Sequence, residues 1–173
     1  MVISCFLNSM YKIGFAEDIH RLVPNRKLLL GGILIPFELG EDAHSDGDVL
    51  LHAISESLLG ALALGDLGKL FPDTSKETEG MDSKIILDKV ISLVRSKGYD
   101  ISNIDTSIIL ERPKLAPHIE DIRQSISNIL NIDIEKVSVK ANTNEGLGPI
   151  GEGKAIKAIS IVLLNKISWY ILI

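Results

Sequence analysis

The sequence predicts a single α/β (α+β) domain in which helices cover one face of a mixed sheet of the four-stranded type. The 173 residues suit one domain, and 46% of them are hydrophobic, enough for a sizeable core. Segments with alternating apolar residues are interleaved with segments whose apolar residues recur at helical spacing. No internal repeat or low-complexity linker divides the chain. We therefore expect one domain over residues 11–165, after a disordered or non-native extension at 1–10 and before an apolar tail at 166–173.

The chain's first elements read as a strand and a hairpin. Residues 11–22 look like a strand. Residues 27–36 form two short β-rich runs around Gly31-Gly32, which is a hairpin signal. The polar stretch ELGEDAHSDGD that follows is expected to be a loop.

A helix and a second loop come next. Residues 48–63 carry apolar positions at helical spacing, and Ser45 or Asp46 can cap the helix. The stretch GDLGKLFPDTS after the helix is marked as a loop by its glycines and proline.

The second half alternates helices and strands. A helix opens at Asp82 or Ser83, runs to Lys97 and stops at Gly98. The remaining segments are a strand at 100–111, a loop bracketed by Pro113 and Pro117, a helix at 118–130, a strand at 136–142, a glycine-rich loop and a last strand at 155–164.

Charge and cysteine content exclude several classes of partner and site. The formal net charge is -5 and no basic stripe is present, so we expect no nucleic-acid partner. A single cysteine, Cys5, excludes an intrachain disulfide and a thiolate metal cluster, and fits a reducing compartment. Neither terminal apolar stretch is long enough to span a bilayer, so we expect no membrane partner and a cytoplasmic location.

The distribution of histidines suggests a metal site. Asp18 and His20 stand two apart in the first strand and therefore share one of its faces. With His52 from a helix packed on that strand, they could supply three ligands and leave one position of Zn²⁺ open, as catalytic zinc requires. Manganese or iron could occupy the same site. The alternatives are a surface or ion-paired couple of Asp18 and His20, and a His52 that is either a satisfied half-buried histidine or the i+4 partner of Asp48.

Three loops carry groups suited to a phosphorylated or hydroxylated ligand, although each could be an ordinary solvated loop. In GDLGKLFPDTS, Asp66 and Asp73 can accept hydrogen bonds from hydroxyl groups. In ERPKLAP, Lys114 is a donor suited to phosphate. In KANTNEGLGPIGEGK, Thr143 could donate to a phosphate and Glu145 could bind Mg²⁺, although the loop does not match the Walker pattern.

Taken in order, these segments resemble the 2-C-methyl-D-erythritol 2,4-cyclodiphosphate synthases of the non-mevalonate isoprenoid pathway. The resemblance covers roughly residues 11–164. The segments that carry it are IGFAEDIHRL, LLLGGILIP, HSDGDVLLHAISESLLGALALGDLGKLFPDTS, SIILERPKLAPHI and VSVKANTNEGLG. The long central segment is specific, because a match of that length with every histidine in place does not arise by chance.

The resemblance implies a metal-dependent lyase reaction. The 2-phosphate of 4-diphosphocytidyl-2-C-methyl-D-erythritol 2-phosphate attacks its own β-phosphorus, CMP leaves, and the 2,4-cyclodiphosphate forms. The resemblance also implies a homotrimer with three active sites between neighbouring subunits. In such an assembly no single subunit need gather every motif.

The resemblance further implies roles for individual residues. The three candidate metal ligands match the family's zinc ligands, and the first two of them also count among the substrate-binding residues. His44, Thr143 and Glu145 match substrate-binding residues. The first two also match residues that stabilise the transition state, and Glu145 matches the ligand of a Mg²⁺ or Mn²⁺ ion that bridges the α- and β-phosphates. The other positions that match substrate-binding residues are Ser45, Asp66, Leu67, Gly68, Phe71, Pro72, Asp73, Thr74, Ser75, Leu110, Glu111, Arg112, Pro113, Lys114, Leu115, Ala116, Asn142 and Asn144.

Three positions depart from the family pattern, and one of them is Lys154, which stands where the family has glutamate. Glu56 stands where the family commonly has aspartate, and we expect it to support a zinc ligand. Glu152 stands where the family has an arginine that faces the trimer's central cavity, so we expect weak or absent binding of isoprenoid-type diphosphates there. Lys154 is expected to pair with Glu152.

Two other functions compete with the cyclising synthase. A metal-dependent phosphohydrolase would use the same open site on water and release linear products. A trimeric binding module for nucleotides or isoprenoid phosphates would keep the pocket without turnover.

Overall fold

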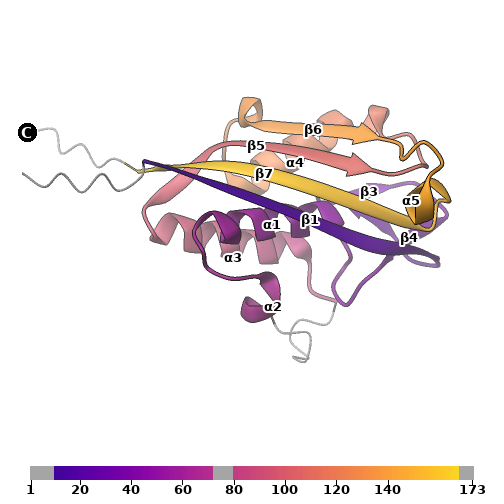
Figure 1. Cartoon of the computed structure of the whole chain (residues 1–173), viewed down its shortest axis with the longest axis horizontal. Helices are drawn as coiled ribbons and strands as arrows, with labels where there is room; N and C mark the ends of the chain where they lie inside the picture. The colour runs from indigo at the N-terminus through magenta and orange to yellow at the C-terminus, as the bar shows by residue number, and fades with distance from the viewer. Residues whose placement is uncertain (1–9, 72–79, 168–173) are drawn as a thin grey trace, which may run out of the picture.

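A mixed sheet organises the fold, and the computed structural model describes it over residues 10–71 and 80–167. Within these residues the main sheet has five strands in the order β4-β1-β7-β5-β6 (Figure 1). All neighbouring strands are antiparallel except β5 and β6, which are parallel. The strands are β1 (Tyr11–Pro24), β4 (Leu39–Asp42), β5 (Tyr99–Ile109), β6 (Val137–Asn142) and β7 (Ala155–Lys166).

The fifth strand corrects the expectation of a four-stranded sheet. β4 lies within ELGED, which its polar composition assigned to a loop. It pairs antiparallel with the end of β1, where Asp42 lies opposite Arg21. A four-residue edge strand is too short to show alternation in its sequence, so only its pairing with β1 reveals it.

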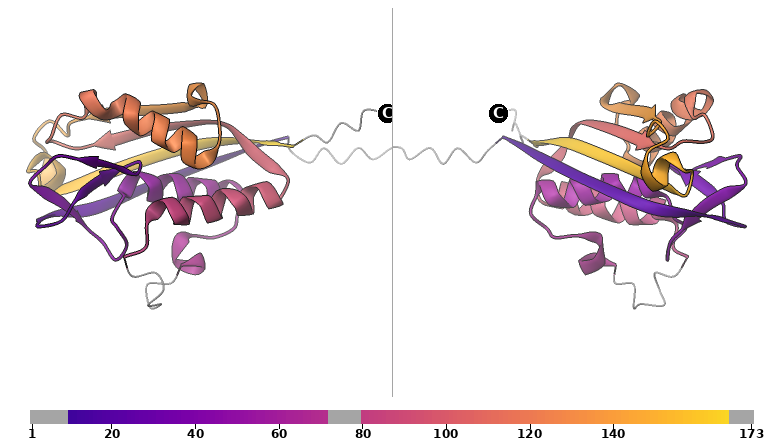
Figure 2. Two further views of the ribbon diagram at one scale, coloured as in Figure 1. Left: turned by 180° about the vertical axis from the view of Figure 1, so that it is seen from behind. Right: turned by 45° about the vertical axis from the view of Figure 1, so that its right-hand side comes forward.

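Three long helices in the described part of the chain cover one face of the sheet, as expected (Figure 2). They are α1 (Val49–Ala61), α3 (Ser83–Ser96) and α4 (Ile119–Leu130). Their inward apolar residues form one core with the sheet, including the fully buried side chains of Ile54, Val90 and Ile126. None of the helices in the described ranges is long and apolar enough to cross a membrane.

The N-terminus of α1 differs from the prediction. Its N-cap is Asp48, whose carboxylate accepts from Leu51 N, instead of Ser45 or Asp46. The same carboxylate also accepts from Gly31 N and Gly32 N, at 3.0 and 2.6 Å. Asp48 therefore fastens the start of the helix to the hairpin turn.

The hairpin itself is confirmed. β2 (Leu28–Leu30) pairs antiparallel with β3 (Ile33–Ile35). Both turn glycines have positive φ, 61° and 79°, as the tight two-residue turn requires.

Short helices stand in two of the segments that the sequence predicted as loops. α2 (Leu67–Leu70) lies within GDLGKLFPDTS, and α5 (Gly148–Gly151) lies within the glycine-rich loop. A single helical turn holds too few residues to show a periodic pattern. Two 3₁₀ turns, Ala116–His118 and Ile134–Lys136, precede α4 and β6.

The other face of the sheet is exposed, and β1 carries several large apolar side chains on it. In Figure 1 this face looks toward the viewer, with β1 and β7 in front of the helices. Ile13 is 72% exposed, Phe15 61% and Ile19 57% on β1, and Ile161 on β7 is 41% exposed. An exposed apolar patch of this kind is typical of an interaction surface.

Candidate active site

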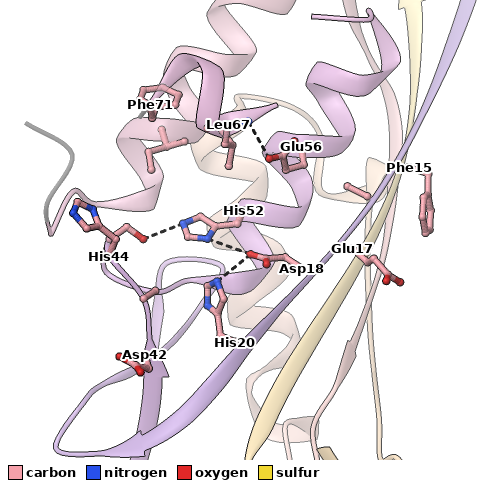
Figure 3. Close-up of a pocket in the computed structure, with 15 residues that line it drawn as sticks. Phe15, Glu17, Asp18, His20, Asp42, His44, His52, Glu56, Leu67 and Phe71 are labelled. Carbon is pink, nitrogen blue, oxygen red and sulfur yellow. Dashed lines mark hydrogen bonds and ion pairs between the residues drawn. The ribbon is translucent and has the colours of Figure 1, made fainter. Parts of the chain in front are cut away.

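Three metal-ligating side chains converge between β1 and α1 (Figure 3). Asp18 Oδ2 lies 3.0 Å from His20 Nε2 and 3.3 Å from His52 Nδ1. One ligand atom from each residue lies within 4.8 Å of the other two. The structure therefore brings together the three residues that the sequence singled out as metal ligands.

The fold explains how these side chains meet. Asp18 and His20 point toward the helices because side chains two apart in a strand share a face. Gly14, on the same face, lets α1 lie close, since a Cβ there would fall 1.9 Å from Ser57 O. This close contact between β1 and α1 sets His52 beside Asp18.

The second ring nitrogen of His20 also has partners. His20 Nδ1 lies 2.7 Å from Glu41 Oε2 and 3.1 Å from Gly47 O. Both partners are acceptors, so the neutral ring carries its proton on Nδ1 and turns its Nε2 lone pair toward the cluster.

The second ring nitrogen of His52 faces hydroxyl groups. His52 Nε2 lies 3.1 Å from Ser45 Oγ and 3.0 Å from Ser83 Oγ. The Ser83 hydroxyl donates in turn to the Asp46 carboxylate. The Asp48 carboxylate binds the backbone amides described above, so the alternative that pairs it with His52 is wrong.

The cluster is strongly polarised. Burial raises the pKa of Asp18, but the hydrogen bonds from His20 and His52 outweigh it and hold that pKa well below its usual range. Burial lowers the pKa of His20, but its hydrogen bonds to Asp18 and Glu41 outweigh it and raise the pKa to about 10. A cation that binds here must displace the His20 proton. One carboxylate oxygen and two imidazole nitrogens form a donor set that fits Zn²⁺ with an open position.

A cavity of about 560 Å³ opens over the cluster. Of the residues that the resemblance assigned to substrate binding, His44, Ser45, Leu67, Gly68 and Phe71 line it. Asp66 caps α2, accepting from Lys69 N at 2.9 Å. Four further expected residues lie outside the described residues, namely Pro72, Asp73, Thr74 and Ser75.

Glu56 plays a different part from the one expected. Its Oε1 accepts from Leu67 N at 2.9 Å, which ties α1 to the start of α2. Burial raises the pKa of this carboxyl. Glu56 thus holds a wall of the cavity, and its hydrogen bond goes to α2 instead of a metal ligand.

A second cavity of about 260 Å³ lies at the carboxyl ends of the parallel strands β5 and β6. Leu110 N donates to Asn142 O at 3.0 Å, which joins the two loops that follow these strands. Arg112 precedes Pro113 through a cis peptide bond. The expected residues that line the cavity are Leu110, Glu111, Pro113, Lys114, Leu115, Ala116, Asn142 and Thr143.

The remaining expected residues of this loop lie beside the second cavity. Thr143 Oγ1 donates to Glu145 Oε1 at 2.8 Å, and Asn144 N donates to Glu111 Oε2 at 3.2 Å. Glu145 has a φ of 52°, a left-handed conformation that is uncommon for a residue with a Cβ. The turn therefore holds the threonine hydroxyl and the glutamate carboxylate side by side.

The two cavities are separate within one chain. Among the described residues, none lines both. The pairing runs from Asp18 through Ala158 and Ile108 to Ala141, so three strand spacings, about 14 Å, separate β1 from β6. The predicted site is therefore divided into a metal half and a loop half.

Three residues that contact the metal half or its backbone were missed in the sequence: Glu41, Ser83 and Arg26. Arg26 donates to the carbonyls of Glu41, Ala43 and Ser45 at 3.1, 3.0 and 3.3 Å. It thereby fixes the backbone that presents His44. No local pattern marks these residues, because each acts through a contact made only in the folded chain.

The pair expected near the chain's last strand is confirmed. Lys154 Nζ lies 2.6 Å from Glu152 Oε2. Both residues line a third cavity of about 610 Å³, together with Ile19 and Pro149.

Comparison with known proteins gives consistent matches along the chain. The model of the YgbB family matches residues 11–165. A protein of Trichlorobacter lovleyi is 50% identical over 153 residues, which are 88% of this chain and 98% of that protein. A protein of Clostridium perfringens is 54% identical over 155 residues, 90% of this chain and 99% of that protein. Both are named 2-C-methyl-D-erythritol 2,4-cyclodiphosphate synthase.

Solved structures agree. A 2C-methyl-D-erythritol-2,4-cyclodiphosphate synthase with CDP bound superposes with a TM-score of 0.83 at 38% identity, covering 89% of this chain and 100% of that chain. The bifunctional IspDF of Campylobacter jejuni gives a TM-score of 0.89 at 36% identity, covering 92% of this chain and 43% of that chain.

Proposed function

Because the chain belongs to the YgbB family of 2-C-methyl-D-erythritol 2,4-cyclodiphosphate synthases, we propose that it makes the 2,4-cyclodiphosphate from 4-diphosphocytidyl-2-C-methyl-D-erythritol 2-phosphate. An oxygen of the 2-phosphate bonds to the β-phosphorus. The bond from that phosphorus to the bridging oxygen breaks, and CMP leaves with the oxygen. The observation that carries the proposal is the cluster of Asp18, His20 and His52 beneath a cavity, in a chain about half identical to these synthases over its matched length.

The metal half of the site suits a charged phosphate. Asp18, His20 and His52 would hold Zn²⁺ or another divalent transition metal, with an open position toward the cavity. When bound, such an ion supplies positive charge that offsets the repulsion between two phosphates of one substrate. The His44 imidazole and the Ser45 hydroxyl line the same cavity and would bind and orient those phosphates.

The loop half suits the nucleotide end of the substrate. Leu110 to Ala116 would form the cytidine pocket, where Lys114 supplies a positive charge. Thr143 would donate a hydrogen bond from its hydroxyl to a phosphate oxygen in the transition state, and the neighbouring Glu145 would bind Mg²⁺ or Mn²⁺. Two solved relatives are described as bound to CDP, which supports a cytidine nucleotide ligand.

No side-chain nucleophile is needed, because both reacting groups belong to one substrate. Binding its two ends in separate half-sites holds the molecule folded for ring closure, and that is a large part of the catalysis. The two halves would meet between neighbouring subunits of a homotrimer. The apolar outer face of β1 and β7 supplies a surface for that assembly.

The direct test is incubation of the purified full-length protein with the cytidyl substrate, Zn²⁺ and Mg²⁺. We expect release of CMP, and a ³¹P NMR spectrum of a cyclic diphosphate. Linear phosphate products would indicate a phosphohydrolase instead. Tight CDP binding without any CMP release from the substrate would indicate a binding module and contradict the synthase assignment.

A further inference from the structure

A fully buried carboxylate lies directly behind the metal cluster. Glu41 is 0% exposed. Its Oε2 lies 2.7 Å from His20 Nδ1 and accepts from Val49 N at 3.1 Å. Its Oε1 has no hydrogen-bond partner in the described part of the chain. Burial of a carboxylate with an unpaired oxygen is costly, and the contacts of Oε2 with His20 and Val49 offset part of that cost.

We propose that Glu41 is a positioning residue for the metal site, which fixes His20 and the start of α1 through one carboxylate oxygen. The inference rests on the proposed function for the use of the site. It adds a residue that neither the sequence motifs nor the relatives' names identify. Glu41 touches the outer nitrogen of a ligand, and not the cluster's open face.

The first part of the argument concerns the imidazole. A histidine binds a metal through one nitrogen, and the partner of the other nitrogen sets its tautomer and the direction of its ring. Here Gly47 O, at 3.1 Å, and Glu41 Oε2, at 2.7 Å, both face Nδ1. The carbonyl can fix the tautomer, but only the carboxyl group of Glu41 can also carry a negative charge, and in its ionised form it makes Nε2 a stronger donor to a cation.

The second part concerns the helix that carries His52. Val49 is the first residue of α1, and its N–H is one of the amides that a helix leaves without an intrahelical partner. That N–H and His20 Nδ1 meet the same oxygen of Glu41. The carboxylate therefore sets the position of β1 relative to α1, the two elements that present the three ligands.

The backbone of Glu41 is held as firmly as its side chain. Its carbonyl accepts from Arg26 Nε at 3.1 Å, and its strand pairs with β1, where it lies opposite Leu22. Gly47 is also close, because a Cβ there would lie 3.0 Å from the Glu41 side chain. The carboxylate is thus preorganised before any metal binds.

The test compares Glu41→Gln and Glu41→Leu in the full-length protein, with Glu38→Gln as the matched control. Glu38 is an exposed acid three residues earlier on the same segment. Zinc affinity is measured by competition with a chromophoric chelator. We expect Glu41→Gln to weaken zinc binding about tenfold, because the amide keeps an acceptor but loses the charge, and Glu41→Leu to weaken it up to about 100-fold. The control should bind zinc as tightly as the wild type.

Urea denaturation of each metal-free variant separates positioning from a purely structural role. Lower stability with unchanged zinc affinity in both Glu41 variants would overturn the proposal. If Glu41→Leu does not fold, the nearly isosteric Glu41→Gln decides alone. Zinc binding that depends on Glu41 in a protein that releases no CMP would support the positioning role while refuting the proposed reaction. A wild-type protein that binds no zinc would overturn the positioning role itself.

Discussion

The role of His52 can be tested separately from folding. Its ring contacts Asp18 at one nitrogen and two serine hydroxyls at the other, while the apolar residues of α1 supply the helix's packing. We expect His52→Ala to lose bound zinc and to lower CMP release more than about 100-fold. The reason is that losing a group that only supports a metal ligand already costs up to about 100-fold, and a ligand itself should cost more. Atomic absorption and circular dichroism would report the zinc and the fold. The control His118→Ala should retain its zinc, and full activity of His52→Ala would contradict the ligand role.

The metal-free protein should lose stability as the pH rises. Burial lowers the pKa of His20, but its hydrogen bonds outweigh burial and raise the pKa from 6.5 to about 10. The stability that the bound proton contributes is therefore complete below pH 6.5 and is lost as the pH rises toward 10. Burial raises the pKa of Glu41 from 4.5 to about 8, so its ionisation destabilises the fold increasingly over that interval. Both groups bind more protons in the folded state than in the unfolded state, and the two effects have the same sign.

Zinc should reverse this dependence. Because the site binds a cation only when the His20 proton has left, zinc binding releases protons and tightens as the pH rises. Melting temperatures measured between about pH 6 and pH 9 should fall without metal, whereas the increase caused by zinc should grow. A metal-free protein whose melting temperature rises across this interval would contradict the titration of His20 and Glu41.

The three clustered residues could be singled out from the sequence, whereas the residues that contact them from other elements could not. Asp18 and His20 could be placed on one face because strand periodicity is local, and helical spacing placed His52 on the next helix, which was expected to pack on that strand. Glu41 lies 21 residues from His20 in the chain, and Ser83 lies 31 residues from His52. Such pairs depend on how β1, β4, α1 and α3 pack, which no short pattern encodes.

Among the secondary structure elements, α1 depends on a single buried cap. The Asp48 carboxylate accepts from Leu51, Gly31 and Gly32, and its own burial raises its pKa. We expect Asp48→Ala to lower the free energy of unfolding by about 3 kcal/mol or more, since a lost cap costs about 1 kcal/mol and each buried orphaned amide about 1–3 kcal/mol. Urea denaturation of the metal-free protein measures it.

The matched control for that prediction is the cap of α3. Asp82 accepts from Lys84 N at 2.8 Å, but its side chain is 42% exposed. Asp82→Ala should therefore cost only about 1 kcal/mol, because water can reach the freed amide. Equal losses in the two variants would show that Asp48 does not fasten the hairpin to α1.

Length decides which elements could be predicted. The three long helices and the four longer strands each contain several repeats of their apolar period, and their positions match the prediction within a few residues. β4, α2 and α5 contain four residues each. Their polar or glycine-rich sequences resemble loops, and tertiary contacts such as the Glu56–Leu67 hydrogen bond stabilise them.

In the whole molecule, the exposed apolar side chains on the outer face of β1 and the divided site support one interpretation. A single chain exposes Ile13, Phe15 and Ile19 on β1 and keeps its two half-sites on strands separated by β7 and β5. A symmetric assembly that buries this face could bring the metal half of one subunit to the loop half of its neighbour. The proposed homotrimer would account for both the exposed apolar side chains and the divided site.

Mixing two inactive variants tests that assembly. His52→Ala damages only the metal half, and Thr143→Ala damages only the loop half. If each site takes one half from each of two neighbours, random co-assembly of equal amounts leaves about one quarter of the sites with both halves intact. Co-refolded mixtures should then release CMP at about one quarter of the wild-type rate, although each variant alone is inactive.

A mixture of His52→Ala with Asp18→Asn should recover no activity, because both changes damage the metal half. Native mass spectrometry would verify that the first pair forms mixed oligomers. If these mixed oligomers show no recovery of activity, the whole site lies within one subunit.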